Sequence, residues 1–265
     1  MLILRPPFDT LWKNKNPFVE VEKLSGEVYR SVATRTTIRF EIEGKGFYLK
    51  LHHGITYGEF FKNIFSFRMP VFGARNEWLA IEKLGQAGID TMRGVAYGET
   101  GFNPIKRTSF IVTEDLSPTI SLEDFCENWT NNPPPYAVKK VLVSRVAYMV
   151  REMHRLGINH RDCYICHFLL QLPFNDLEHF KLSIIDLHRA QIRASVPLRW
   201  RNKDLVALYY SCLNIGLTTR DYLRFLKIYF PGKKLKQILS EEKSLIDSMQ
   251  SKAQKIKERT LRKGL

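Results

Sequence analysis

The sequence predicts an α+β protein with two lobes, because strand-like segments fill its first part and helix-like segments fill its second. Three consecutive strand-like segments lie within residues 27–51, whereas the longest apolar repeat with helical spacing runs from Val138 to Met153. The chain of 265 residues is 44% hydrophobic and 12% aromatic, so it can bury a sizeable core. This composition excludes an intrinsically disordered protein.

The N-terminal lobe is predicted to contain an antiparallel sheet. Residues 27–32 and 37–42 alternate with a period of two, as strands with one buried face do. Glu43-Gly44-Lys45-Gly46 then turns the chain into a third strand over residues 47–51. Short connections of this kind predict a meander, and residues 110–112 (Phe-Ile-Val) indicate a further strand.

One helix is predicted within this lobe, from about Asn76 to Leu84 and ending near Gly85. Glu77 and Ile81 lie on the same face of it as Leu84, at steps of four and three residues. A carboxylate on an otherwise apolar helix face needs a buried partner.

The C-terminal lobe is predicted to be mainly helical. Its first long helix carries the apolar repeat 138–153, and Gly157 stands where a C-terminal cap belongs. Two short apolar pieces, 168–172 and 182–185, predict a small hairpin. Three further helices are predicted after it: Asp204 to Cys212, Thr219 to Tyr229, and Leu235 to about Arg262.

The junction between the lobes is predicted at residues 113–118, which follow the last strand and have the character of a hinge. The N-terminal lobe then comprises residues 1–112 and the C-terminal lobe residues 119–265.

The chain is strongly basic, with 41 Lys and Arg against 27 Asp and Glu and a net charge of +14. This charge predicts an acidic partner, which could be nucleic acid, an anionic membrane surface or an acidic protein. We find no zinc finger or RNA-recognition motif, so the positive charge is the only feature in favour of nucleic acid. Charge alone is not sufficient, and we expect no nucleic-acid partner. No segment has the features of a membrane span or a secretory signal, so we expect a cytoplasmic protein.

The densest polar cluster covers residues 159–167, Asn-His-Arg-Asp-Cys-Tyr-Ile-Cys-His. Cys163 to His167 matches the haem-attachment pattern C-x-x-C-H, but that chemistry requires export, which nothing in the sequence directs. The same residues with His160 could ligate zinc, although a cluster this tight in sequence seldom wraps one metal. A third interpretation makes residues 160–162 an H-R-D catalytic loop, with Asp186 as a metal ligand about 24 residues later.

The order of these candidate residues resembles the protein-kinase-like fold. Lys50 lies on the third strand, Glu77 on the following helix and Glu114 in the hinge, before the H-R-D motif and Asp186. Such a fold has an N-terminal sheet lobe with one key helix and a mainly helical C-terminal lobe. The resemblance makes residues 1–112 the nucleotide-binding lobe and residues 119–265 the catalytic and acceptor-binding lobe.

More closely, three segments resemble the lipopolysaccharide core heptose(I) kinases (WaaP/RfaP) of Gram-negative bacteria. They are residues 159–170, 185–190 and 199–205, of which the first is the most specific. The resemblance extends over almost the whole chain. It implies transfer of the γ-phosphoryl group of ATP to O-4 of the first heptose of the lipopolysaccharide inner core. The alternative is an enzyme of the same fold that phosphorylates another sugar or a protein hydroxyl.

The resemblance also assigns roles to individual residues. Asp162 would accept the proton of the heptose hydroxyl or orient that hydroxyl, and Asp186 would hold Mg²⁺. Lys50 would pair with the phosphates of ATP and be held by Glu77, and Glu114 would contribute to nucleotide binding from the hinge. The support of the catalytic loop would come from His160, Arg161 and Asp204, the last at the start of a helix.

Some positions differ from the protein-kinase pattern. The chain has no G-x-G-x-x-G motif, and His167 replaces the Asn that is the usual second magnesium ligand, although a neutral imidazole can bind a divalent metal. No A-P-E motif follows Asp186, which argues against a protein substrate.

The resemblance further implies acyl carrier protein as a partner and a location at the cytoplasmic face of the inner membrane. The Phe-rich segment 60–72 would dip into the inner leaflet if it is exposed, giving a peripheral membrane contact.

Overall fold

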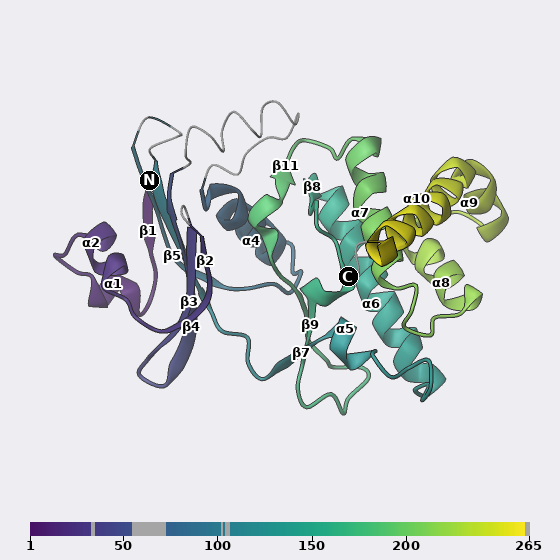
Figure 1. Ribbon diagram of the computed structural model, residues 1–265, viewed down its shortest axis with the longest axis horizontal. Coiled ribbons are helices and arrows are strands. Elements are labelled where there is room, and N and C mark those ends of the chain that lie inside the picture. Colours follow the sequence, from purple (N-terminus) through teal and green to yellow (C-terminus); the bar gives the residue numbers. More distant parts are fainter. Residues whose placement is uncertain (33–34, 55–72, 102, 104–106, 263–265) are drawn as a thin grey trace. The chain divides into compact units, whose positions relative to one another are not determined.

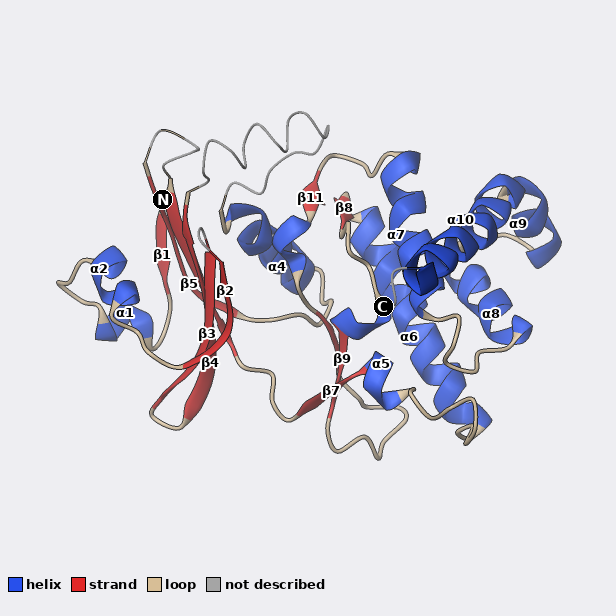
Figure 2. Cartoon of the chain, viewed as in Figure 1, coloured by secondary structure: helices blue, strands red, loops and turns tan. Residues whose placement is uncertain are grey.

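The computed structural model describes residues 1–32, 35–54, 73–101, 103 and 107–262. Within it the chain forms two compact units (Figures 1 and 2). Unit 1 comprises Met1–Gly85, Met92–Ser117 and Leu187–Arg189, and unit 2 comprises Gln86–Thr91, Pro118–Asp186 and Ala190–Leu265. The Phe-rich segment 60–72, on which the predicted membrane contact depends, lies outside the described residues.

Unit 1 is built on a six-stranded sheet in the order β1-β5-β6-β4-β3-β2, in which all neighbours are antiparallel. Its strands are β1 (Leu2–Leu4), β2 (Glu27–Val32), β3 (Arg35–Ile42), β4 (Lys45–His53), β5 (Gly94–Thr100) and β6 (Thr108–Glu114). The predicted meander is confirmed as β2-β3-β4. Strand β5 was not predicted, because its first five residues are all buried and it shows no alternation of polar and apolar residues.

The two faces of this sheet carry different helices (Figure 2). Helices α1 (Phe8–Leu11) and α2 (Pro17–Glu22) pack on one face, where Phe8 meets Phe47 edge to face at 5.3 Å between ring centroids. Helix α4 (Arg75–Gln86) covers the other face, where Trp78 stacks on Tyr97 at 5.3 Å. Gly94 permits this close packing, because a Cβ atom there would lie 2.6 Å from the Trp78 ring.

Unit 2 is mainly helical. Its helices are α5 (Leu122–Phe125), α6 (Tyr136–Arg155), α7 (Leu198–Ser211), α8 (Thr219–Tyr229), α9 (Leu235–Glu241) and α10 (Lys243–Arg262). Its short strands are β7 (Thr119–Ser121), β8 (Ile158–Asn159), β9 (Phe168–Gln171), β10 (Leu182–Ile184) and β11 (Gln191–Ile192). The predicted hairpin is confirmed as the antiparallel pair β9-β10, and Gly157 follows α6 with a φ of +76°.

Two predicted helix boundaries were wrong. Helix α7 begins at Leu198, directly after Pro197, so Asp204 lies in its second turn rather than at its start. The start of α7 was not predicted because residues 199–203 are mostly charged, and the apolar periodicity of a helix begins only at Leu205. The segment predicted as one C-terminal helix is two, α9 and α10, which separate at Glu242.

The break at Glu242 has a tertiary cause. Its carboxylate pairs with Arg201 of α7 at 2.9 Å, and Leu245 and Ala253 of α10 are then buried. Apolar spacing alone does not reveal such a change of direction.

No helix among the described residues is both long and apolar enough to cross a membrane. The α+β class, with a sheet first and helices afterwards, is as predicted.

Candidate functional site

In unit 1, Lys50 and Glu77 form a largely buried ion pair. Side chains alternate along β4, so Phe47, Leu49 and Leu51 enter the core beneath α1 and α2 while Lys50 points toward α4. The Lys50 ammonium donates a hydrogen bond of 2.6 Å to Oε1 of Glu77, which lies in the first turn of α4 and is 1% exposed. The structure thereby supplies the buried partner that the position of Glu77 required.

Glu114 ends strand β6 in the same unit. Its backbone N–H donates to the carbonyl of Arg93 at 2.9 Å, and its carboxylate lies 3.3 Å from the guanidinium of that arginine. Unit 1 continues to Ser117, so Glu114 lies close in sequence to the boundary with unit 2.

In unit 2, Asp204 fixes the backbone of the H-R-D segment. One carboxylate oxygen accepts the N–H of His160 at 2.6 Å, and the other accepts the N–H of Arg161 at 2.8 Å. Asp204 is 0% exposed, and hydrogen bonds to a buried carboxylate are strong. They hold Arg161 at a φ of +74°, a conformation that costs a residue with a side chain about 1–2 kcal/mol.

His154 extends this network and was not anticipated from the sequence. Its Nε2 lies 3.2 Å from Asp204, and its Nδ1 lies 2.6 Å from the hydroxyl of Tyr229. Helices α6, α7 and α8 are thus connected through a single buried imidazole. The only sequence signal was a histidine in the last turn of an apolar helix, which is also typical of an ordinary core residue.

His160 reaches the segment that carries Asp186. Its Nε2 donates to the carbonyl of Ile185 at 2.9 Å, which places the proton of the neutral ring on Nε2. Burial lowers the pKa of His160, so the ring is neutral at physiological pH. Asp186, the next residue after Ile185, has a φ of +59°.

His167 and Asp186 form a pair of converging acceptors. The carbonyl of Asp162 lies 2.7 Å from Nδ1 of His167, so this nitrogen carries the proton and Nε2 keeps its lone pair. That Nε2 lies 3.6 Å from Oδ2 of Asp186. An imidazole whose other nitrogen donates to a carbonyl is typical of a metal ligand, and a carboxylate beside it suits a divalent cation.

The pair does not form a complete metal site by itself. In the described part of the chain, no three or more His, Cys, Asp or Glu residues are grouped so that they could hold a metal ion. Mg²⁺ commonly binds through one or two protein ligands together with phosphate oxygens and water, so two ligands fit that ion.

The cysteines of the polar cluster are packed thiols. Cys163 is fully buried, and burial raises its pKa well above the ordinary value. Burial also raises the pKa of Cys166 to about 11, so both residues stay protonated at neutral pH.

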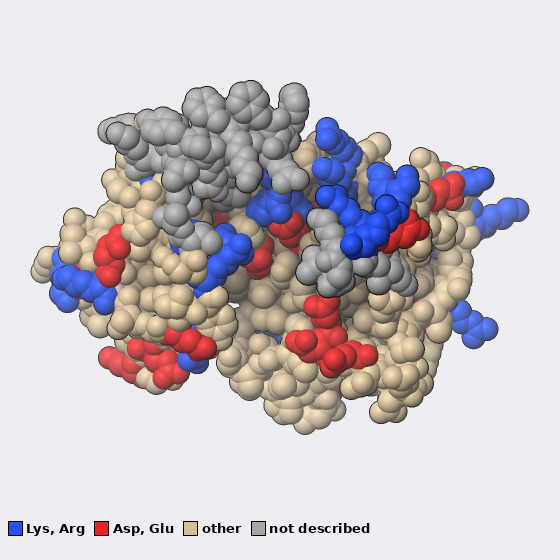
Figure 3. Space-filling model, in the orientation of Figure 1, with Lys and Arg blue, Asp and Glu red and all other residues tan. Residues whose placement is uncertain are grey.

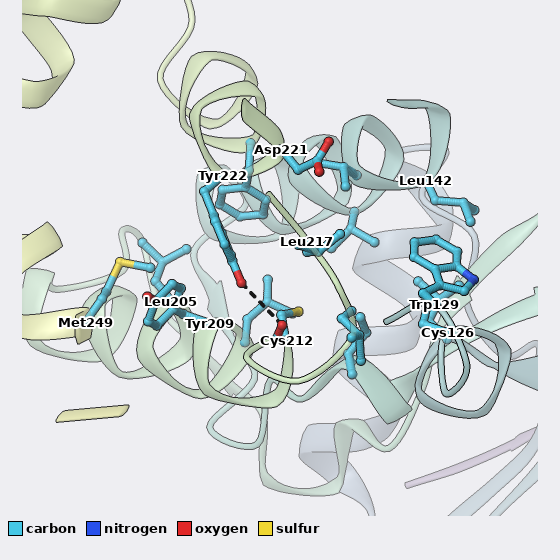
Figure 4. A pocket seen from close by; sticks show the side chains of 17 residues that line it. Cys126, Trp129, Leu142, Leu205, Tyr209, Cys212, Leu217, Asp221, Tyr222 and Met249 are labelled. Carbon is cyan, nitrogen blue, oxygen red and sulfur yellow. Dashed lines mark hydrogen bonds between the residues drawn. The ribbon is translucent and has the colours of Figure 1, made fainter. Parts of the chain in front are cut away.

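Unit 2 also contains an apolar cavity of roughly 600 Å³, open solvent at its mouth included (Figure 4). Its walls come from α5, α6, α7, α8 and α10, and they include Trp129, Leu142 and Met249. Two polar side chains in these walls are already bonded: Asp221 accepts from Thr218 and Arg224, and the Tyr222 hydroxyl donates to the Cys212 carbonyl. The cavity therefore suits an aliphatic group and not a nucleotide or a sugar.

A family model and two full-length relatives all indicate the same family of proteins. The family model described as "Lipopolysaccharide kinase (Kdo/WaaP) family" matches residues 19–229. The chain is 59% identical over 266 residues to the lipopolysaccharide core heptose(I) kinase WaaP of Escherichia coli K12, covering 100% of both chains. It is 52% identical over 265 residues to the protein of the same name from Pseudomonas aeruginosa, covering 99% of this chain and 98% of that one.

A solved structure is also similar to this chain. It is described as "WaaP in complex with acyl carrier protein", and it superposes with a TM-score of 0.86 at 49% identity, covering 96% of this chain and 98% of that chain. This agreement confirms the protein-kinase-like fold that the resemblance implied. The family model spans most of the chain and full-length relatives share more than half of its residues, so the chain belongs to the lipopolysaccharide kinase (Kdo/WaaP) family.

Proposed function

We propose that this protein is an ATP-dependent kinase that phosphorylates the first heptose of the lipopolysaccharide core. The observation that carries the proposal is the arrangement around Asp162, whose loop is anchored by Asp204 and whose carbonyl orients His167 toward Asp186. The names of the two full-length relatives support the substrate. Phosphoryl transfer requires positioning and charge neutralisation more than covalent chemistry, and the anchored loop supports the positioning.

Asp162 is the residue that would meet the acceptor hydroxyl. The backbone on both sides of it is fixed, because Asp204 holds the N–H of Arg161 while Tyr164 and His167 both donate to the Asp162 carbonyl. A carboxylate on such a restrained backbone can accept the hydroxyl proton or align the oxygen for attack at little entropic cost.

His167 and Asp186 would hold Mg²⁺ together with the phosphates of ATP. The bound ion neutralises charge on the phosphate oxygens. The contribution of the chain is the lone pair of His167 Nε2, which the Asp162 carbonyl orients, and the adjacent Asp186 carboxylate.

Unit 1 would bind the nucleotide. Glu77 fixes the ammonium group of Lys50, and a cation held in one position is suited to pair with phosphate oxygens. We assign Glu114 to the same nucleotide-binding role because it ends β6 near the boundary of unit 1. In this assignment residues 1–112 are the nucleotide-binding lobe, residues 113–118 the hinge, and residues 119–265 the catalytic and acceptor-binding lobe.

The decisive experiment measures phosphate transfer. The purified protein is incubated with ATP labelled in its γ-phosphate and with core lipopolysaccharide that lacks heptose phosphate, and Asp162→Ala is assayed in parallel. We expect label on the first heptose with the wild type and none with the variant. Label on a different sugar or on protein would replace this function with another acceptor, and equal transfer by the variant would refute the assignment of Asp162.

We propose acyl carrier protein as a partner, at the cytoplasmic face of the inner membrane. The support is the solved relative, which is in complex with acyl carrier protein, the net charge of +14, which attracts a small acidic protein, and an apolar cavity that suits an aliphatic chain. Gel filtration of the protein mixed with acylated or unacylated carrier is the test. We expect a complex that is more stable with the acylated form. Equal elution with both forms would show that the cavity does not contribute to binding of the carrier.

A further inference from the structure

Trp200 lies in the first turn of α7, and four cationic side chains surround its ring. The distances to a ring centroid are 4.5 Å from Lys203 Nζ, 5.4 Å from Arg199 Cζ, 5.6 Å from Arg161 Cζ and 5.8 Å from Arg193 Cζ. We call these five residues the Trp200 cluster. All of them belong to unit 2, and Figure 3 shows Lys and Arg side chains gathered over the region where Figure 1 draws the start of α7.

The cluster is assembled by the tertiary structure. Arg199 and Lys203 neighbour Trp200 along the helix, but Arg161 comes from the H-R-D segment and Arg193 follows β11. Gly157 makes the approach of β11 feasible, because a Cβ atom there would lie 2.0 Å from the Arg193 carbonyl.

Two cations of this cluster, Arg193 and Arg199, have no carboxylate partner among the described residues. The guanidinium of Arg193 donates to Oδ1 of Asn159 and Oε1 of Gln191, both at 2.7 Å, and these amide oxygens are neutral. Holding like charges around one ring is unfavourable without an anion to bind, so the arrangement points to an anionic ligand.

The cluster is also coupled to Asp162. Asp204 lies four residues after Trp200 on α7 and accepts the backbone N–H groups of His160 and Arg161. The same helix therefore carries the cluster and anchors the loop, and Arg161 of the cluster directly precedes Asp162. A group bound at Trp200 would therefore lie beside the loop that carries Asp162.

We infer that the Trp200 cluster binds a carboxylate-bearing sugar of the acceptor, next to the sugar whose hydroxyl is phosphorylated. This inference rests on the proposed function. Arg side chains match a carboxylate with paired N–H groups, and an indole face provides apolar surface for the C–H groups of a sugar ring. We choose a carboxylate over a phosphate because the acceptor has not yet received its heptose phosphate when it binds. The cluster positions the acceptor, and Asp162 remains the group that meets the reacting hydroxyl.

The test compares the double variant Arg199→Gln/Lys203→Gln with a matched control, Lys234→Gln/Lys236→Gln. The control removes two exposed cations at the start of α9 in the same unit. Binding of core oligosaccharide is measured by calorimetry without ATP, and KM values for acceptor and ATP are measured with ATP. We expect the cluster variant to weaken oligosaccharide binding and to raise the acceptor KM about tenfold, with the ATP KM within about twofold of wild type. The control should change neither.

A second acceptor identifies the group that is bound. When the sugar carboxylates of the core are reduced to alcohols, wild-type binding should fall to the level of the cluster variant, and the variant should be insensitive to the reduction. Trp200→Phe should retain most of the affinity and Trp200→Ala should lose it. Equal oligosaccharide affinities of the cluster variant and the control variant would overturn the inference. So would an equal loss of affinity by wild type and cluster variant when the carboxylates are reduced. Oligosaccharide binding that follows the expected pattern without phosphate transfer would instead reject the proposed function alone.

Discussion

The Nε2 atom of His167 lies 3.6 Å from Oδ2 of Asp186, with its lone pair fixed by the hydrogen bond between Nδ1 and the Asp162 carbonyl. This relationship connects the residue proposed to meet the acceptor with the two proposed to hold the metal. The tautomer of His167 is thus set by the backbone of the loop that carries Asp162.

Asp186→Ala should be inactive because the metal-nucleotide complex binds weakly. We expect the affinity for ATP in the presence of Mg²⁺ to fall at least tenfold, while binding in the absence of Mg²⁺ changes little. Asp162→Ala is the control, because its carboxylate meets the acceptor and its ATP affinity should stay close to wild type. Calorimetric titration of both variants with ATP, with and without Mg²⁺, gives the answer, and equal losses in the two variants would contradict the separation of roles.

His167→Asn should keep measurable activity, whereas His167→Ala should lose most of it. An Asn side chain can present an oxygen to a metal ion and Ala cannot. Initial rates at several Mg²⁺ concentrations distinguish the roles, because the Asn variant should need more Mg²⁺ for half-maximal rate. If both variants are equally inactive and folded, His167 acts elsewhere, for example on the sugar.

Asp204→Asn should disrupt the H-R-D segment. One of the two oxygen acceptors becomes an N–H₂ group that faces a backbone N–H, so Arg161 loses the bond that helps to hold its positive φ. We expect a loss of about 2–3 kcal/mol in unfolding free energy, measured by chemical denaturation, together with a fall in kcat of about 100-fold.

Asp221→Asn is the matched control for that variant. Asp221 is also buried and accepts the backbone N–H of Thr218, but at the start of α8, where it forms a capping box. It should lose stability and retain kcat. Similar losses of kcat in both variants would assign the Asp204 effect to general destabilisation.

Stability should fall in acid because of His52. Burial lowers the pKa of this imidazole to about 3, with Arg35 and Lys50 contributing in the same direction, against about 6.5 in the unfolded chain. The unfolded state therefore binds the extra proton between these values, so His52 costs no stability above pH 6.5 and up to about 1.4 kcal/mol per pH unit as the pH falls toward 3.

His52→Leu removes this dependence. Unfolding free energies between pH 7 and pH 4 should decline less steeply for this variant than for wild type. Parallel slopes for the two proteins would assign the acid sensitivity to other groups.

The sequence by itself determined the fold class, the β2-β3-β4 meander and the family. Alternation and turn residues were sufficient for β2 to β4, because one face of each strand is buried and the connections are short. The position of Glu77 on an apolar helix face required a buried partner. The order of motifs indicated Lys50 as that partner, and the two residues do form an ion pair. The 159–170 stretch indicated the family on its own.

Only the tertiary structure decided how distant residues meet. Asp204 reaches the backbone of His160 across 44 residues, and the Trp200 cluster unites residues from 161 to 203. No local pattern encodes such contacts, because they depend on how helices pack. The orientation of the His167 lone pair was likewise invisible in the sequence, since it follows from a hydrogen bond to a carbonyl whose direction is fixed by the folded loop.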